Sequence, residues 1–395
     1  MRFLVAAFAA CTVLSACQDP AGVGLGLIDE EQLDPSVRTV ALSGLGTTPD
    51  TTIAIGIADG TNTDLLQTRV LVGSVVDPTY GDARARAYVD VIQAANLPSD
   101  ATAEDVTAAW LVLTQNYVYG DTTTTLPLEL RPITETWFAD TDYARNRTLS
   151  TGDVLATTEV SVADSLRQFD LPASWVAANA ATLVGDGFLD AFEGFAIDIP
   201  ADYVPAPGAV YGFSTFASTG SGLRVVVGED TLVYPLSEVF SSVTSGTAST
   251  PPSTALPVRN NSGLAVGFEV DFSTIGASAL ARARLRLPLD ESFAAEGPFV
   301  RPIPARSVLY GINDDGRVAL AEVLYVDGEL SVTNTSILTP LVQRILLDPS
   351  TGFDRYEVLP SSGTTSLDIL PIRLPSVGTT DLPRFTLTVV GGTSS

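Results

Sequence analysis

Short runs of alternating apolar and polar residues, separated by turn residues, most constrain what this chain can fold into. In the run 279–287, alanine and leucine occupy every odd position, while Arg282, Arg284 and Arg286 occupy even positions. Residues 126–131 alternate in the same way. A period of two places successive side chains on opposite faces of a half-buried strand. The abundant threonine, valine and glycine also fit strands and turns, so the sequence predicts an all-β chain.

Turn residues indicate how these strands connect. Residues 313–316 (Asn-Asp-Asp-Gly) and the pair Asp327-Gly328 each separate two strand-like runs, which is typical of hairpins. Helical periodicity is confined to two short segments, 173–183 and 337–347. Antiparallel strands in this number normally close into two-sheet sandwiches. We therefore expect two antiparallel, jelly-roll-like β-sandwich domains with few short helices.

The domain boundaries follow from composition. A chain of 395 residues favours two or three domains. Residues 241–262 are rich in serine, threonine and proline and have little to bury, which is typical of a linker. The sequence thus predicts a first domain over 37–240 and a second over 263–395.

The two halves also resemble diverged copies in the order of their elements. An opening strand (106–113 or 279–287) precedes a helical piece (around Trp175 or 338–347) and a closing strand (223–227 or 385–390).

The N-terminus reads as a bacterial export signal. One arginine precedes an apolar run over 3–14 and the sequence Leu14-Ser15-Ala16-Cys17. The run is too short to span a bilayer. Small residues before a cysteine resemble the lipobox, in which the cysteine is acylated and becomes the new N-terminus. The alternative is an ordinary signal peptide with a chance cysteine. We expect a signal peptide over 1–17, a lipid-modified (diacylglycerol and palmitate) Cys17, a flexible tether over 18–36 and anchoring in the cell outer membrane.

Several catalytic side chains are missing from the sequence. It contains no histidine and no lysine, and its two cysteines are Cys11, inside the predicted signal, and Cys17. Nucleophilic triads, Cys-His pairs, lysine Schiff bases and His- or Cys-ligated zinc are therefore excluded. Carboxylate chemistry and oxygen-ligated calcium remain open. The acidic groups Asp314-Asp315 and Asp186/Asp190/Glu193 lack the spacing of an EF-hand loop, so we expect solvated turns, no metal site and no cofactor.

The charge of the chain is strongly negative. Forty-six acidic residues against 21 basic ones give a formal net charge of −25, and every basic residue is arginine. Such a chain repels nucleic acid, which we exclude as a partner. Adaptation to high salt and a codon bias from lysine to arginine both explain this composition.

Residues near the start of the mature chain carry a family resemblance. Asp19, the glycines at 24–26, the phrase Val-Gly-Ser-Val-Val-Asp-Pro-Thr-Tyr-Gly at 72–81 and the strand at 85–89 resemble the opening of Bacteroidota lipoproteins of domain-of-unknown-function family 4270. Phe-Glu-Gly-Phe at 192–195 is similar to a later landmark of that family. The resemblance implies a cell-envelope lipoprotein without an established activity. A fainter likeness, at 109–113 and 133–137, is to jelly-roll modules that bind polysaccharide or act as spacers.

Two surface features are candidate ligand sites. Trp110 should point away from Ala109, Leu111 and Leu113, so it lies on the outer face of its strand, where an indole can stack on a sugar ring. The alternative is that another strand, another domain or a partner covers Trp110.

Arg282, Arg284 and Arg286 form a basic stripe that suits acidic polysaccharide or phosphate. The alternative for the stripe is pairing with carboxylates of its own domain. Trp137 is expected to pack in the core and Trp175 to anchor its short helical piece onto the sheet. The segment 77–81 is expected to be a tight turn.

Together these observations predict a non-catalytic cell-envelope lipoprotein that acts as a binding or assembly component at the outer membrane. Its partner is either an outer-membrane protein complex or a glycan. The alternative is a carboxylate-dependent, glycoside-active enzyme, which needs two close carboxylates across a cleft.

Overall fold

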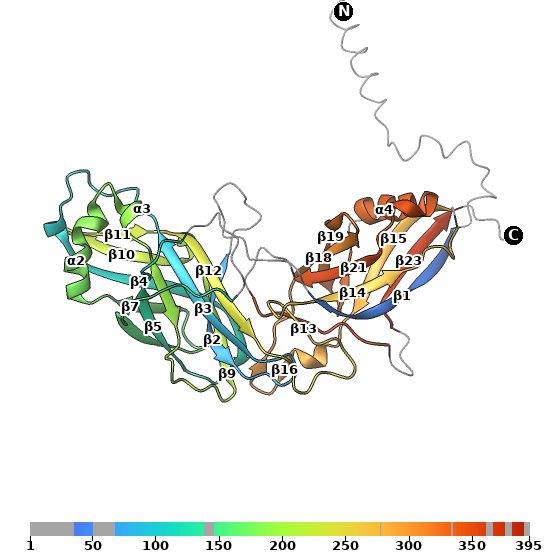
Figure 1. Ribbon diagram of the computed structural model, residues 1–395, viewed down its shortest axis with the longest axis horizontal. Coiled ribbons are helices and arrows are strands. Elements are labelled where there is room, and N and C mark those ends of the chain that lie inside the picture. Colours follow the sequence, from blue (N-terminus) through green and yellow to red (C-terminus); the bar gives the residue numbers. More distant parts are fainter. Residues whose placement is uncertain are drawn as a thin grey trace, which may run out of the picture.

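The computed structural model describes residues 35–49, 68–137, 146–276, 278–332, 335–360, 366–375 and 381–390. Strands dominate the described residues, so the prediction of an all-β chain is confirmed. Figure 1 shows two β-rich units at opposite ends of the long axis of the molecule.

The first unit is built on one large, curled sheet. Its main path runs in the order β11-β10-β4-β9-β2-β3-β8-β5-β6, with β7 added to β4 and β12 added to β3. Buried side chains such as Leu111, Phe195 and Tyr211 fill its interior. The strands of this sheet are β2 (Arg69–Val75), β3 (Ala83–Val91), β4 (Val106–Asp121), β5 (Leu126–Pro132), β6 (Ala156–Val160), β7 (Leu166–Asp170), β8 (Phe195–Asp198), β9 (Gly208–Ser214), β10 (Gly222–Val227), β11 (Asp230–Tyr234) and β12 (Leu236–Ser245).

The second unit closes into a barrel. Its strands pair in the cyclic order β1-β14-β21-β18-β19-β20-β15-β23. The sheet therefore closes on itself, whereas the two sheets of the expected sandwich would have free edges. Phe268, Leu285, Val323 and Phe385 are among the buried side chains of its core. The strands are β1 (Ser36–Pro49), β14 (Leu264–Val270), β15 (Ala279–Pro288), β18 (Arg306–Asn313), β19 (Gly316–Val326), β20 (Glu329–Ser331), β21 (Arg355–Pro360) and β23 (Arg384–Val390).

The helices are short and pack outside the strands. The predicted segments 173–183 and 337–347 form α2 (Ala173–Val184) and α4 (Thr335–Leu347), and α3 (Phe188–Ala191) adds one turn. No helix within the described ranges is long and apolar enough to cross a bilayer. The single-turn 3₁₀ helices are η4 (Ala103–Asp105), η5 (Ala217–Thr219), η6 (Glu291–Phe293) and η7 (Pro349–Thr351).

The parallel between the two halves extends to their strand pairing. The opening strand β4 pairs antiparallel with the closing strand β10, and β15 pairs antiparallel with β23. In both halves the helix packs against the opening strand, α2 on β4 and α4 on β15. The alternation within β15 begins later than the sequence indicates. Ala283, Leu285 and Leu287 are buried, but Ala279 and Ala281 are exposed because the register with β23 shifts between Leu280 and Arg282.

The assignment of residues 37–240 to one domain is wrong at its start. Strand β1 pairs with β14 and β23 and so completes the barrel. Conversely, the small strands β16 (Ala295–Glu296) and β17 (Phe299–Val300) come from the second half of the sequence but extend the first sheet through β4. The two units therefore exchange chain segments, which composition alone does not reveal.

The linker predicted over 241–262 is also corrected. Residues 241–245 belong to β12, which pairs with β3 as far as Ser245. The Ser241 hydroxyl accepts the Leu71 N–H at 2.9 Å, so this serine is part of a buried hydrogen-bond network. Further on, β13 (Val258–Arg259) pairs with β22 (Ile369–Leu370), and Arg259 is fully buried. The polar composition of 241–262 wrongly predicted an exposed linker, because residues of the sheet and its neighbours form hydrogen bonds with its buried polar groups.

The predicted turn at 77–81 lies where the two units meet. The Asp77 carboxylate accepts the N–H groups of Thr79 and Tyr80 at 2.9 and 3.2 Å, which closes the turn. The same carboxylate is paired with Arg301, whose Nε and Nη2 lie 2.8 and 3.1 Å from its two oxygens. Arg259 donates to the backbone carbonyls of Gly81 and Asp82. Two arginines from the second half of the sequence thus hold a turn of the first.

Hairpin turns explain why particular glycines are required. Asp327 and Gly328 join β19 to β20, and both have positive φ, 50° and 78°. A two-residue turn of this kind matches the twist of the strands it joins.

Gly328→Ala is expected to lower the free energy of unfolding by about 1 kcal/mol, because an L side chain at positive φ is strained. Urea titration measures this change. Gly46→Ala is the control, since φ there is not in the positive range and the nearest atom to an added Cβ is 3.8 Å away. Equal stability of the two variants would contradict the prediction.

Candidate binding pocket at the barrel mouth

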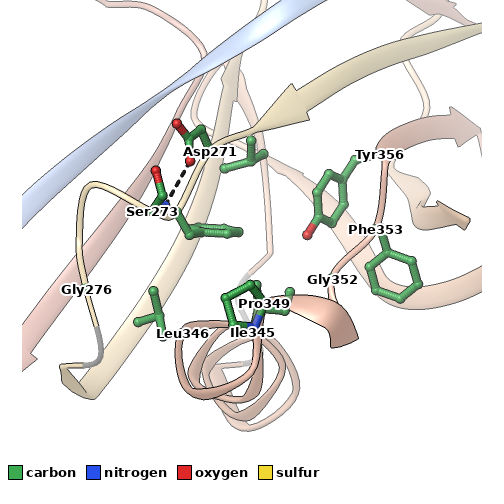
Figure 2. A pocket seen from close by; sticks show the side chains of 11 residues that line it. Asp271, Ser273, Gly276, Ile345, Leu346, Pro349, Gly352, Phe353 and Tyr356 are labelled. Carbon is green, nitrogen blue, oxygen red and sulfur yellow. Dashed lines mark hydrogen bonds between the residues drawn. The ribbon is translucent and has the colours of Figure 1, made fainter.

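A cavity of about 440 Å³ opens at one end of the barrel (Figure 2). It lies between the end of β14 with its following loop and the C-terminal end of α4 with η7. Small-ligand sites in proteins have volumes of roughly 300–1,000 Å³, and barrel mouths are common places for them. The lining residues are Val270, Asp271, Phe272, Ser273, Gly276, Ile345, Leu346, Pro349, Gly352, Phe353 and Tyr356.

Two turns that are capped by aspartate create this opening. The Asp271 side chain accepts the Ser273 N–H at 2.8 Å and turns the chain sharply after β14. The Asp348 side chain accepts the Ser350 N–H at 3.1 Å, and Pro349 begins η7 directly after α4. Such side-chain to backbone bonds favour turns over continued helix or strand. Both chain segments therefore leave the barrel before they fill its mouth.

Tyr356 supplies a polar group to the apolar cavity. Its ring is held by Phe268 and Phe353, with centroid distances of 5.7 and 5.8 Å. Its hydroxyl points into the cavity in Figure 2. Burial raises the pKa of Tyr356 to about 12, so the hydroxyl keeps its proton at neutral pH. None of the residues that the structure describes forms a hydrogen bond to this hydroxyl.

Asp271 supplies a negative charge at the rim. Its side chain is exposed to solvent. Hydrogen bonds from the side chain and backbone of Ser273 lower the pKa of Asp271, so the carboxylate is ionised at neutral pH. Among the described lining residues, it is the one charged side chain.

A second cavity, of about 410 Å³, lies where the two units meet. Arg69, Tyr117 and Asp368 are among its lining residues. The Arg69 guanidinium lies 4.6 Å from the centroid of the Tyr117 ring, and the Tyr117 hydroxyl accepts the Leu367 N–H at 2.9 Å. One carboxylate oxygen of Asp368 is buried without a hydrogen-bond partner among the described residues. Burial raises the pKa of Asp368. The barrel-mouth cavity suits an apolar ligand better than the second cavity, because its lining is mainly aliphatic and aromatic.

Trp110 lies on the predicted face of its strand. Ala109, Leu111 and Leu113 are buried, and Trp110, on the opposite face, is half-buried. Its neighbours across the sheet are Arg224 on β10 and Asp170 on β7.

Trp137 is buried in the core, and the half-buried Trp175 anchors α2 onto the sheet, as expected. The Trp137 indole donates to the Glu193 carbonyl at 2.8 Å, and Trp175 packs against Phe195 at a centroid distance of 5.6 Å.

The basic stripe on β15 is largely engaged within its own unit. Arg284 and Arg286 both bind Glu329, with Nη2–Oε1 and Nε–Oε2 distances of 2.8 and 2.6 Å. This is the cross-strand pairing given above as the alternative to ligand binding. Arg282 is exposed. Arg84 and Arg86 bind Asp198 in a similar way in the first unit.

The acidic groups do not gather into a metal site within the described residues. Asp314 and Asp315 are exposed in the β18–β19 turn, and Asp186 is exposed after α2. Glu193 is half-buried and accepts the Thr136 hydroxyl at 2.8 Å. The Asp190 side chain lies outside the described residues.

Two carboxylates, Asp368 and Asp90, have the raised pKa that the glycoside-active alternative requires, and Asp368 is the one carboxylate among the described residues that line the second cavity. Burial, together with repulsion from Glu238 and Glu193, raises the pKa of Asp90 to about 7. Asp90 lines neither of the two cavities described above.

Sequence reasoning did not identify the residues of the barrel-mouth cavity. The available signal was the pair of capping patterns, Asp-x-Ser at 271–273 and Asp-Pro-Ser at 348–350, each placed directly after a regular element. Cys17 and residues 18–34 of the tether lie outside the described residues. No family model, no curated protein and no solved structure matches this chain, so the resemblance to family 4270 stays a prediction.

Proposed function

We propose that this chain is a non-catalytic binding protein of the bacterial cell envelope, held in the outer membrane by the lipid on Cys17. Its barrel unit binds a small, mainly apolar ligand at the barrel mouth. The observation that carries this proposal is the cavity of about 440 Å³, with an apolar lining and the Tyr356 hydroxyl inside. The sequence has no histidine and no lysine, and the predicted mature chain has no free cysteine, which favours binding over catalysis.

The position of the cavity relative to the chain start supports a ligand from the membrane. Strand β1 begins at Ser36, which pairs with Val389 near the end of β23. The rim loop leads into β15, whose first residue, Ala279, pairs with Val390. The rim and the strand that follows the tether therefore lie at the same end of the barrel. A lipid on Cys17 would keep this end close to the bilayer surface.

A glycan or an outer-membrane protein complex remains the proposed larger partner. The half-buried Trp110 between Arg224 and Asp170 supports the glycan version, because an indole flanked by polar side chains suits a sugar ring. The exchange of β1, β16 and β17 between the two units does not favour a glycan over a protein complex as the partner.

The barrel-mouth proposal is tested with N-phenyl-1-naphthylamine, an uncharged dye whose fluorescence rises in apolar surroundings. The wild-type chain should bind it. Leu346→Trp, which enlarges a lining side chain, should weaken binding about tenfold to a hundredfold, since overfilling a packed site costs about 1–3 kcal/mol.

The matched control is Leu347→Trp. Leu347 is the next residue of α4, but it is 68% exposed and does not line the cavity. Circular dichroism melting of both variants checks that the fold is retained. Equal dye binding by the two variants, or no binding by the wild type, would refute the barrel-mouth site.

A further inference from the structure

We propose that the barrel mouth selects an uncharged amphiphile, with one apolar chain and a carbonyl acceptor, and discriminates against the corresponding fatty-acid anion. The inference rests on the proposed binding function, and it assigns the ligand class of that same cavity. Three properties of the cavity carry it: its apolar lining, the fixed Tyr356 hydroxyl and the ionised Asp271 at its rim.

The lining selects an apolar body. Phe272, Ile345, Leu346 and Phe353 come from three separate segments and face one space. Phe272, Ile345 and Leu346 are at most 7% exposed, so they are packed on their other sides and cannot readily collapse into the cavity. A ligand chain gains free energy there by leaving water. The volume of about 440 Å³ admits one such chain rather than a whole two-chain lipid.

Tyr356 selects an acceptor at a defined position. Its ring contacts Phe268, Phe353 and Phe385, so the hydroxyl is held in place before any ligand arrives. Because the hydroxyl stays protonated, it offers a donor inside an apolar space. A carbonyl oxygen of an ester or amide is the natural partner for such a donor, since an unpaired polar group inside the cavity is costly.

Asp271 selects against negative charge. The carboxylate stands at the rim, where the head of an amphiphile would lie once its chain is inside. Repulsion between two like charges is stronger beside an apolar, low-dielectric wall than in open water. Arg344 on α4 does not line the cavity, so Asp271 is the one charged side chain among the described lining residues. The net charge of −25 adds a field of the same sign.

The test is displacement of N-phenyl-1-naphthylamine by two ligands with the same twelve-carbon chain. Monolaurin has an ester and an uncharged glycerol head, whereas laurate has a carboxylate. We expect monolaurin to displace the dye at a concentration at least about fivefold lower than laurate does. This concentration ratio should fall as salt screens the charge. Asp271→Asn should remove most of the difference between the concentrations of laurate and monolaurin that displace the dye.

Tyr356→Phe should weaken monolaurin about twofold to tenfold, the effect of one hydrogen bond, and leave dye binding unchanged. Tyr203→Phe, in the first unit, is the control and should change neither monolaurin binding nor dye binding. Equal displacement by laurate and monolaurin while the dye still binds would overturn the selectivity and leave the proposed function standing. Failure of the dye to bind would overturn both. If Asp271→Asn still preferred monolaurin over laurate to the same extent, Asp271 would not be the group that discriminates against the anion.

Discussion

Replacing Arg301 with methionine is expected to lower the free energy of unfolding by about 3–5 kcal/mol, because it leaves the Asp77 carboxylate buried without its partner. Asp77 is fully buried and the Arg301 side chain is 3% exposed. The pair joins the turn at 77–81 to the segment between β17 and β18, so it fixes this part of the second half of the sequence on the first sheet. Burial alone would raise the pKa of Asp77, but the hydrogen bonds from Arg301 and Tyr119 outweigh it and lower that pKa.

The contribution of Asp77 therefore has a defined pH window. A carboxyl with a lowered folded pKa stabilises the fold above its unfolded pKa and loses that contribution as the pH falls through its folded value. Arg301→Met should remove this contribution and flatten the acid limb of the stability profile. Urea titration at several pH values measures both effects.

The matched control is Arg306→Met. Arg306 pairs with Glu322 at 3.2 Å, but the two side chains are 68% and 51% exposed, and such surface pairs contribute about 0–1 kcal/mol. If Arg301→Met were no more destabilising than Arg306→Met, the buried pair would not stabilise the fold in the way proposed.

Asp90→Asn is expected to stabilise the chain at alkaline pH by about 2–4 kcal/mol relative to its effect at pH 4. Burial, with repulsion from Glu238 and Glu193, raises the pKa of Asp90 to about 7, so folding favours its protonated form. Below the unfolded pKa, near 4, both states carry the proton and there is no penalty. As the pH rises through 7, the folded state must ionise this half-buried group and stability is lost.

Asparagine keeps the acceptor for the Val91 N–H, which lies 2.7 Å from the Asp90 oxygen, and removes the charge. Urea titration between pH 4 and 8 measures the difference between variant and wild type. Asp202→Asn, at an exposed position, should show no such pH dependence. A constant difference across the range would show that Asp90 ionises without penalty.

Local patterns in the sequence predicted local structure well. The alternation at 126–131, the two hairpin turns and both helical segments all appear where periodicity and turn chemistry place them. These features depend on neighbouring residues alone. The all-β class follows because one face of each strand must be buried.

The pairing of segments that lie far apart in the chain could not be predicted from the sequence. Strand β1 looks like any other alternating run, and nothing in it shows that its partners are β14 and β23, more than 200 residues away. Ser241 and Arg259 look like linker residues because their burial depends on partners such as Leu71 and Gly81. The cavity was missed for the same reason: its walls come from segments that meet only in the folded barrel.

The central claim, that the barrel mouth is a ligand site, is tested most directly by hydrogen exchange with and without bound monolaurin. We predict slower amide exchange in residues 270–276 and 345–356 of the wild-type chain, and no such change in Leu346→Trp. The first unit should exchange at the same rate in both. Protection spread evenly over the molecule, or equal protection in Leu346→Trp, would contradict a binding site at the barrel mouth.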